Sequence, residues 1–504
     1  MKHSQQSNRV AAFGRKPVDA ALCRVPLLLI LNSSFFLLLA GCNLAPSYHQ
    51  PPVPTPPAFK ETNGWKLAQP GDGIIKGRWW EMFHDPQLSA LEEQVAISNQ
   101  NIAAALENFF AARALVKEAR SAYYPTVSVD PSATKAQSRH NAVAEGNYSA
   151  FTLPADASWE LDLWDAVRNT VRADVYAAQA SAATLENMKL AAQADLAVDY
   201  YELRGQDEMI LLFNETVKAY QASVDLTTTL FQTGIDSELD YAQADALLQT
   251  TKAQATALDI QRAQYEHAIA LLVGQPASTF SIKAAPMSTP PPAVPVGLPS
   301  TLLERRPDVA SAERTVAQAN AQIGVARAAW FPTLSLTGSA GYQSASLSSL
   351  VSPQSFFWSV GASLSETLFD VGKRKAADEQ AWANYRATAA SYRQTVLTAF
   401  QQVEDNLAAL RILTTETQQQ NVAVKASQKS LDLSMERYRL GISSYLNVIA
   451  AQETLLGNQQ TAVTLRMQQM VSSVQLIMAL GGGWNTSDLP SSGKLVLKSS
   501  PDGK

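Results

Sequence analysis

Two stretches of this sequence are versions of one motif: ARSAYYPTVS at residues 119–128 and ARAAWFPTLS at residues 326–335. They lie 207 residues apart, and three shorter pairs follow in the same order at offsets of 205 to 207 residues. The shorter pairs are residues 163–165 with 368–370, Gly234-Ile235 with Gly441-Ile442, and residues 271–274 with 478–481. A fixed offset that recurs in one order indicates an internal repeat. We therefore predict that the chain is a duplication of one structural unit.

Each copy changes its hydrophobic period directly after the shared motif. Pro125 and Pro332 end the preceding helix, because proline and the residue before it disfavour helical backbone. Apolar and polar residues then alternate after each proline, and again over residues 151–161 and 356–365. Alternation with a period of two predicts strands that have one apolar face. We expect four short amphipathic strands per chain, arranged as a pair of β-hairpins.

A long helical stretch without a breaker follows in each copy, over residues 165–232 and 370–440. At a rise of about 1.5 Å per residue, each helix would extend on the order of 100 Å. The second copy has a heptad-like apolar rhythm that favours coiled-coil packing. This rhythm consists of Val396, Phe400, Val403, Leu407 and Leu410. Gly234 and Gly441 are then expected to turn the chain back into a second helix of each copy.

The chain begins with a targeting segment. Basic residues precede an apolar run, residues 25–40, which is too short and too interrupted for a comfortable transmembrane helix. The run ends in LAGC at residues 39–42, and small residues before a cysteine are typical of a bacterial lipoprotein cleavage site. We predict that Cys42 becomes the first mature residue, with N-palmitoyl and S-diacylglycerol groups attached. A plain secretory signal is the alternative, and Asn43 in place of aspartate favours sorting to the outer membrane.

Pro-rich stretches set the predicted domain boundaries, since such segments favour extended polyproline conformation and act as stiff spacers. The expected order is a signal peptide (1–41), a lipid-anchored Pro-rich segment (42–78), a first repeat (79–284), a Pro-rich linker (285–300), a second repeat (301–484) and a flexible C-terminal tail (485–504).

The strand count has a consequence for assembly. Four strands cannot enclose a lumen, and an open sheet edge would leave backbone N–H and C=O groups unpaired in lipid. We therefore expect subunits to pool their strands in a ring, with apolar faces toward lipid and Ser/Thr faces toward a wet interior. Five aromatic residues suit the membrane–water interface: Tyr123, Tyr124, Trp330, Phe331 and Trp358. The alternative is a soluble α/β protein with a helical stalk.

Several motifs resemble those of the outer membrane factor family, the TolC-like ducts, and most closely its NodT-type efflux lipoproteins. They include LPS at 298–300, LERRPDV at 303–309 and IGVARAAWFP at 323–332. The N-terminal signature is Trp79, Trp80, Phe83, Asp85, Pro86 and Leu88. In the LERRPDV run, Pro307 and Asp308 suit the first turn of a helix, so we interpret this run as capping and packing.

The resemblance implies a mainly α fold with a membrane β-hairpin pair. It implies a homotrimer in the outer membrane of a Gram-negative bacterium, with a 12-stranded β-barrel shared by three subunits. A long α-helical barrel would extend into the periplasm and meet an adaptor protein and an inner-membrane RND-type pump. Drugs or other small solutes would pass through unchanged.

The resemblance also points to a pore aperture where the long helices turn, at residues 234–243 and 441–450. Family members narrow the pore there with acidic residues. Asp236 and Asp240 are the acidic candidates in the first copy, whereas Asn447 stands in the second copy where relatives often carry aspartate. A solvated turn and helix cap is the alternative interpretation of these acids.

Catalysis has little support in this sequence. The histidines are scattered without the spacing of metal ligands, and residues 481–483, three glycines after a helix, suit a helix end. The net charge of -5 and the lack of a basic stripe argue against nucleic acid as a partner. We expect no enzyme activity, and no cofactor or metal apart from the lipid. A type I protein-secretion duct and a lipid-anchored coiled-coil scaffold without a pore remain alternative functions.

Overall fold

The structure is a computed structural model, and it describes all residues except 1–42, 62–76, 139–145, 293, 295–303 and 497–504. The chain divides after Gly41 into a first unit, none of which is described, and a second unit that continues from Cys42 to Lys504. The predicted signal peptide and Cys42 lie outside the described residues. Everything below concerns the second unit.

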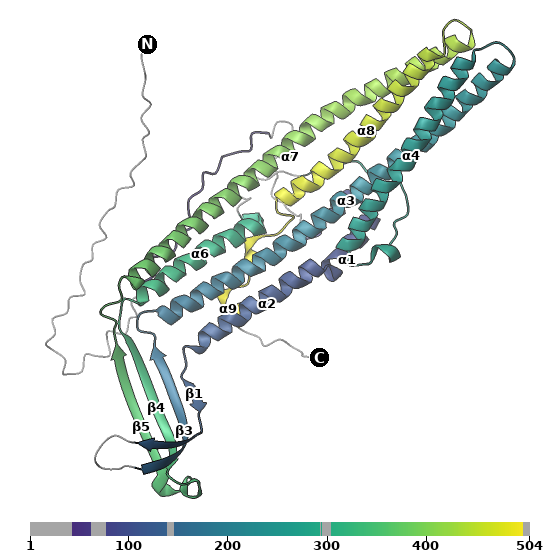
Figure 1. Cartoon of the computed structure of the whole chain (residues 1–504). Helices are drawn as coiled ribbons and strands as arrows, with labels where there is room; N and C mark the ends of the chain where they lie inside the picture. Colours follow the sequence, from purple (N-terminus) through teal and green to yellow (C-terminus); the bar gives the residue numbers. More distant parts are fainter. Residues whose placement is uncertain (1–42, 62–76, 139–145, 293, 295–303, 497–504) are drawn as a thin grey trace, which may run out of the picture. The chain divides into compact units, whose positions relative to one another are not determined.

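The elements follow the same order in both copies (Figure 1). The first copy contains η1 (Trp79–Phe83), α1 (Pro86–Ser98), α2 (Gln100–Ser121), β1 (Thr126–Val129), β2 (Ser132–Ser138), β3 (Gly146–Leu161), α3 (Ala166–Gln232) and α4 (Glu238–Leu272). The second contains α6 (Pro307–Ala328), β4 (Thr333–Ser344), β5 (Phe356–Ser365), α7 (Lys373–Arg439) and α8 (Leu446–Ala479). Short helices lie between and after them: η2 (Ala277–Thr279), η3 (Leu347–Ser349), η4 (Pro353–Ser355), η5 (Thr486–Asp488) and α9 (Ser492–Val496).

The long helices confirm the sequence prediction, because α3 and α7 are each 67 residues long. The second begins at Lys373 and not at Asp370, since the Asp370 carboxylate accepts hydrogen bonds from the backbone N–H groups of Gly372 and Arg374 at 3.1 Å each. Figure 1 shows the sheet at one end of these helices, with the α3–α4 and α7–α8 turns at the other. Among the described helices, none is both long and apolar enough to cross a membrane.

Within the described residues, the sheet contains five strands and not four, in the antiparallel order β1-β3-β4-β5, with β2 also paired to β3. The first predicted strand is broken at Asp130 and Pro131. Val129 pairs with Ala155 and Ser132 with Thr152, so both parts keep one register and Pro154 lies across from the break. Proline has no N–H for the ladder, and prolines on both strands interrupt it at this point.

The register gives the sheet one apolar and one polar face. Leu336 lies between Trp159 and Ala362, and Leu334 between Leu161 and Leu364. The residues one step along, such as Ser335 with Glu160 and Ser363, form the other face. The apolar face is open in the single chain, where Trp358 is 70%, Val360 80% and Val127 68% exposed.

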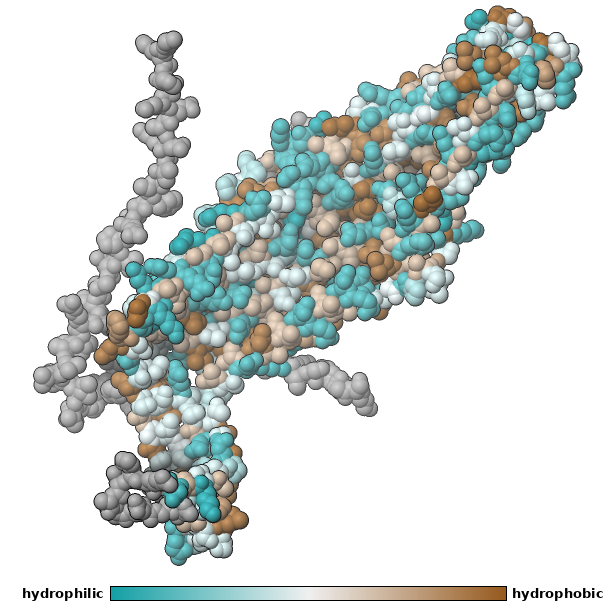
Figure 2. Space-filling view, in the orientation of Figure 1, coloured by the Kyte–Doolittle hydropathy of each residue, from teal (hydrophilic) through white to brown (hydrophobic). Residues whose placement is uncertain are grey.

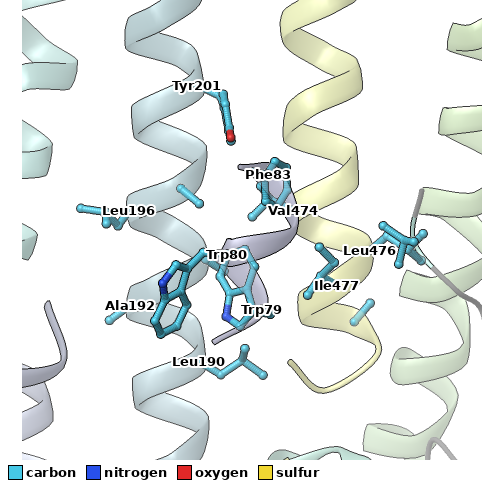
Figure 3. Packing of buried hydrophobic residues seen from close by; sticks show 14 of the residues in the cluster. Trp79, Trp80, Phe83, Leu190, Ala192, Leu196, Tyr201, Val474, Leu476 and Ile477 are labelled. Atoms are coloured by element: carbon cyan, nitrogen blue, oxygen red, sulfur yellow. The ribbon is translucent and has the colours of Figure 1, made fainter. Parts of the chain in front are cut away.

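Polar side chains cover much of the helical surface, with hydrophobic ones scattered among them, as Figure 2 shows. The main core lies where the N-terminal signature meets the long helices. Trp79, Trp80 and Phe83 of η1 are at most 4% exposed and insert between α3 and α8, beside residues such as Tyr201 and Val474 (Figure 3). The signature that supported the resemblance is therefore a hydrophobic wedge between the two copies.

An equivalent hydrogen bond in each copy joins the residue before α2 or α6 to the last residue of α4 or α8. The Asn99 side chain donates to the Leu272 carbonyl at 2.9 Å, and Arg306 donates to the Ala479 carbonyl at 3.1 Å, 207 residues further along in both partners. Arg306 is 8% exposed and also binds the Asp308 carboxylate and the Gln402 side chain. This geometry agrees with a capping and packing role for the LERRPDV run.

A glycine lies two residues after the carbonyl group that accepts each of these hydrogen bonds. Gly274 and Gly481 have φ values of +69° and +93°, and a Cβ at either would collide with the carbonyl oxygen of Ser98 or Arg305. Glycine is therefore required at both positions for its backbone freedom and for the close approach.

The C-terminal tail is not flexible throughout, contrary to the sequence prediction. Residues 485–496 include η5 and α9, and the Leu495 side chain is 1% exposed. It packs with Val116 of α2 and with Val171 and Val175 of α3. The buried Leu495 and the hydrogen bond from the Gln179 side chain to the Pro490 carbonyl at 3.1 Å dock a segment whose composition is typical of a loop. Residues 497–504 lie outside the described chain.

One buried carboxyl group lies in an otherwise apolar helix face. Leu88, Leu91, Glu92 and Val95 form the buried face of α1, and Glu92 is 0% exposed. Within the described part of the chain, neither of its carboxyl oxygens has a hydrogen-bond partner. Burial raises the pKa of Glu92 well above its ordinary value, because a charge there would be desolvated without compensation.

We predict that Glu92 makes stability fall with rising pH. Below the unfolded-state pKa of about 4.3 the carboxyl is neutral in both states and costs no stability; above it the unfolded chain ionises first, so the free energy of unfolding falls by about 1.4 kcal/mol per pH unit until the pH reaches the raised folded-state pKa, and it levels off beyond that. Glu92→Gln should remove this dependence in thermal unfolding scans from about pH 5 to about pH 9. Glu107→Gln, on the exposed surface of α2, is the control. Parallel profiles for wild type and Glu92→Gln would contradict the prediction.

Candidate functional site

The two helical turns that we predicted to form the aperture have matching backbones. Gly234 and Gly441 have φ values of +75° and +71°. The next residue in each copy donates its N–H to a helix carbonyl at 2.9 Å, Ile235 to Leu230 and Ile442 to Arg437. Glycine in this left-handed conformation ends each long helix and reverses the chain. The predicted turns are thus observed, and their side chains differ between the copies.

Asp236 joins the turn of the first copy to the long helix of the second. Its carboxylate accepts a short hydrogen bond from the hydroxyl of Tyr438, which lies near the end of α7. Burial, and then the Asp236 carboxylate, raise the pKa of Tyr438, so the phenol stays protonated and remains the donor. The sequence analysis missed Tyr438, because its partner lies 202 residues away and no local pattern connects them.

Asp240 lies at the first turn of α4 beside the same pair. Its carboxylate accepts a hydrogen bond from the Ser237 hydroxyl at 2.8 Å, and its own N–H donates to that hydroxyl at 3.3 Å. Desolvation and the nearby Asp236 raise the pKa of Asp240, against the stabilising bonds from Ser237. Asp240 therefore takes part in the cap at the start of α4, as the helix-cap interpretation expects. Together with Asp236 it also places two carboxyl groups close together at this turn.

Asn447 lies in a different environment, on the other side of the second hairpin. It is exposed and lines a pocket of about 380 Å³ between α7 and α8. The other lining residues are mostly small or hydroxylated: Ser427, Ser430, Ser434, Arg437, Ser443, Ala450, Ala451 and Thr454. The predicted aperture residues thus divide into an Asp236–Asp240 pair and a separate hydroxyl-lined groove.

A small core holds the two turns together. It consists of Tyr220, Val224, Ala244, Leu248, Tyr438, Tyr445 and Val448, which come from α3, α4, α7 and α8 and the turn before α8. The Tyr438 and Tyr445 rings lie 5.1 Å apart, and Gln452 donates to the Ser223 hydroxyl at 3.2 Å. Any rearrangement of one hairpin must therefore disturb the other.

The predicted interface aromatics lie at two levels of the sheet. Tyr123, Tyr124, Trp330 and Phe331 lie where the helices meet the strands, whereas Trp358 lies opposite Ala340, further along β5. Tyr124 and Trp358 are 72% and 70% exposed, while the guanidinium of Arg374 lies 5.0 Å from the Trp330 ring centre. The apolar face between these levels is the part of the molecule suited to lipid.

The open two-faced sheet, the paired long helices and the acidic first turn together are typical of the class of outer-membrane channels. A model of the outer membrane efflux protein family matches residues 91–275 and again 298–482, so the chain belongs to this family and the match recognises both copies. The resemblance proposed from the motifs is confirmed.

Curated relatives cover nearly the whole chain. The toluene efflux pump outer membrane protein TtgC of Pseudomonas putida is 32% identical over 455 residues, which cover 89% of this chain and 94% of that protein. Nodulation protein T of Rhizobium leguminosarum bv. trifolii is 30% identical over 460 residues, which cover 90% and 96%.

Solved channels share the fold. The outer-membrane channel OprN superposes with a TM-score of 0.83 at 29% identity, covering 88% of this chain and all of that one. The open state of the MtrE channel of Neisseria gonorrhoeae superposes with a TM-score of 0.78 at 26% identity, covering 88% and 99%. The protein is an outer-membrane efflux channel component of a Gram-negative bacterium, and its family consists of transport proteins.

We predict that Tyr438→Phe loosens the turns and raises single-channel conductance or opening frequency in planar bilayers. The change removes the hydroxyl that binds Asp236 and leaves this half-buried carboxylate without its donor. Tyr385→Phe, the same substitution elsewhere in α7, is the control. Equal conductance of Tyr438→Phe and wild type would show that this bond does not restrain the aperture.

Proposed function

We propose that three copies of this chain form one duct, in which twelve pooled strands make a β-barrel and the helices make a periplasmic α-barrel. In this count β1 and β2, which keep one register against β3, are one interrupted strand of each copy. The two-faced sheet carries this proposal. Its order leaves β1 and β5 at the edges, each with one neighbour, while Val127, Trp358 and Val360 extend from an uncovered apolar face. Lipid would cover the apolar face, and strands of neighbouring subunits would pair with the N–H and C=O groups of the two edges.

We propose that Cys42 carries the lipid anchor, because the residues after it are seated near the sheet. The Asn169 side chain, in the first turn of α3, donates to the Asn43 side chain at 3.3 Å, and Arg327 donates to the Leu44 carbonyl at 3.4 Å. Gly324 leaves room for this N-terminal segment, since a Cβ there would lie 2.7 Å from the Ala45 side chain. An acyl chain attached at Cys42 would therefore start close to the helix–strand junction.

We predict that Cys42→Ser abolishes incorporation of radiolabelled palmitate and shifts the protein away from the outer-membrane fraction. Thioether and amide attachment both require the cysteine, so serine cannot be processed. Cys23→Ser, in the segment expected to be removed, is the control. Labelling of the Cys42→Ser protein at the wild-type level would refute the lipid anchor.

The partners proposed for this duct are a periplasmic adaptor and an inner-membrane RND-type pump. The groove between α7 and α8 suits an adaptor helix, because its small and hydroxyl side chains let a backbone approach closely. The relatives are named for efflux of toluene, other solvents and antibiotics. We propose small drug-like or solvent-like solutes as the cargo, which passes through without chemical change.

We propose that Asp236 and Asp240 surround the closed aperture of the ring, and that Asn447 faces the groove between α7 and α8 instead. Three copies would bring at least six carboxylates together, and a cluster of that charge would favour cations. The raised pKa of Asp240 agrees with a crowded acidic site, since burial and Asp236 both disfavour its charged form.

Purified trimers in a planar bilayer should conduct ions, and Asp240→Ala should increase conductance and reduce cation selectivity. The substitution removes a carboxylate from each subunit at the proposed constriction. Asp259→Ala, an exposed acid along α4, is the matched control. Conductance that is absent altogether would favour a scaffold over a duct, whereas unchanged selectivity would remove Asp240 from the aperture.

A further inference from the structure

Arg120 and Arg327 occupy the same position in the two copies, in the last turn of α2 and of α6. The Arg327 side chain has several partners. It pairs with the Asp378 carboxylate at 3.6 Å, donates to the Leu44 carbonyl at 3.4 Å, and lies 5.4 Å from the Trp382 ring centre. Within the described residues, the Nε atom of Arg120 is buried without a hydrogen-bond partner, and no carboxylate pairs with its side chain.

The offset of 207 residues shows why Arg120 lacks these partners. Val171 stands in the first copy where the second has Asp378, and Arg172 stands where the second has Glu379. The first copy therefore has a valine and an arginine in α3 where α7 has two carboxylates. An arginine that is neutralised in one copy is left without its acid in the other.

Three arginines and a tyrosine gather where α2 and α3 meet the sheet. Tyr123 lies three residues after Arg120 and packs against the small core between α2 and α3. Arg168 and Arg172 lie one turn apart on the exposed side of α3. Burial and the Asp162 carboxylate raise the pKa of Tyr123. The positive charges of all three arginines lower that pKa, so the guanidinium groups lie close to the phenol.

The acids at the start of α3 are turned away from solvent. The Asp165 side chain is 1% exposed, whereas the Arg168 side chain, its partner at 2.8 Å, is 49% exposed. The Asp162 carboxylate accepts hydrogen bonds from two backbone N–H groups of the first turn, at 3.0 and 2.8 Å. Arg172 is exposed and donates to the Asn169 side chain at 3.2 Å, which is an uncharged partner. The surface around Tyr123 therefore presents guanidinium groups.

The N-terminal segment indicates the level of this cluster relative to the membrane. Asn169 accepts the hydrogen bond from Arg172 and donates one at 3.3 Å to Asn43, the residue after the proposed anchor Cys42. A diacylglycerol group on Cys42 would therefore begin close to the arginines, on the same side of the helices. The phosphates of surrounding phospholipids lie near the depth of their glycerol groups, within reach of these side chains.

We propose that Arg120, Arg168 and Arg172 bind the phosphate group of an anionic phospholipid in the periplasmic leaflet of the outer membrane. This inference rests on the lipid anchor proposed above, which sets the level of the cluster. Planar guanidinium groups bind phosphate oxygens in pairs, and the hydroxyl of Tyr123 adds an uncharged donor suited to the interface. Since the exposed charges are positive, a headgroup of net negative charge, such as phosphatidylglycerol, fits better than a zwitterionic one.

Native mass spectrometry of the purified protein in detergent tests the site, with phosphatidylglycerol and phosphatidylethanolamine as probes. The wild-type protein should retain phosphatidylglycerol in preference. Arg172→Glu gives the first copy the residue that the second has at position 379, and Arg120→Gln removes the unpaired charge. Affinity for phosphatidylglycerol should fall about fivefold for each unit of charge, hence about fivefold for Arg120→Gln and about 25-fold for Arg172→Glu.

Arg386→Glu is the matched control, because it makes the same change in net charge on an exposed part of α7. Arg386 lies about 20 Å along the helix from its start, beyond the reach of the headgroups. Its affinity for phosphatidylglycerol should equal that of wild type. Thermal unfolding of Arg172→Glu and Arg386→Glu should coincide, since both residues are exposed and neither substitution disturbs the core.

The outcomes separate this inference from the proposed anchor. Equal retention of phosphatidylglycerol by wild type, Arg172→Glu and Arg386→Glu would show that the arginines do not bind a headgroup. Displacement of the lipid by excess inorganic phosphate would identify a site for the free anion and overturn the lipid assignment. The same spectra give the mass of any acyl groups. A chain without them whose lipid binding still depends on Arg172 would refute the anchor and leave the headgroup site standing.

Discussion

Hydrogen bonding at the edges of one small sheet constrains the rest of this structure. In the middle of the sheet, β3 and β4 pair on both sides, whereas β1 and β5 each have a single neighbour. Water can satisfy an open edge, but a hydrocarbon environment cannot, so an apolar-faced sheet with two free edges is incomplete as a single chain. The residues that flank those edges, including Phe369 and Tyr124, are correspondingly exposed.

The duplication builds the fold from two copies of one unit, and the copies differ in a few side chains at equivalent positions. Asn99 and Arg306 make equivalent hydrogen bonds in the two copies, but only Arg306 brings a charge, with which it binds the Asp308 carboxylate. At the opposite end, the turns share a backbone, yet Asp236 binds a tyrosine that belongs to the other copy. The hydrogen bond between Tyr438 and Asp236 thus joins the two hairpins through side chains that the copies do not share.

Much of the architecture could be predicted because its signals are local and periodic. The 67-residue helices, the strand over residues 356–365 and the glycine turns all follow from spacing of apolar residues and helix breakers. Two differences from the prediction have visible causes: the first strand is interrupted at Asp130 and Pro131, with Pro154 across from Asp130, and Leu495 docks the tail. The partners of Tyr438 and Arg306 could not be predicted, since Asp236 and Ala479 are distant from them in sequence.

The wedge formed by Trp79, Trp80 and Phe83 has a consequence for the order in which the chain folds. These residues are among the first to emerge during export, but the surface that buries them includes α8, which is among the last. Contacts of such large sequence separation form slowly, because much of the chain must be ordered before they close. Until α8 arrives, a strongly apolar segment stays uncovered, together with strands that have free edges. Assembly of this channel is therefore limited by the completion of its own polypeptide, and the newly exported chain needs protection from aggregation during that interval.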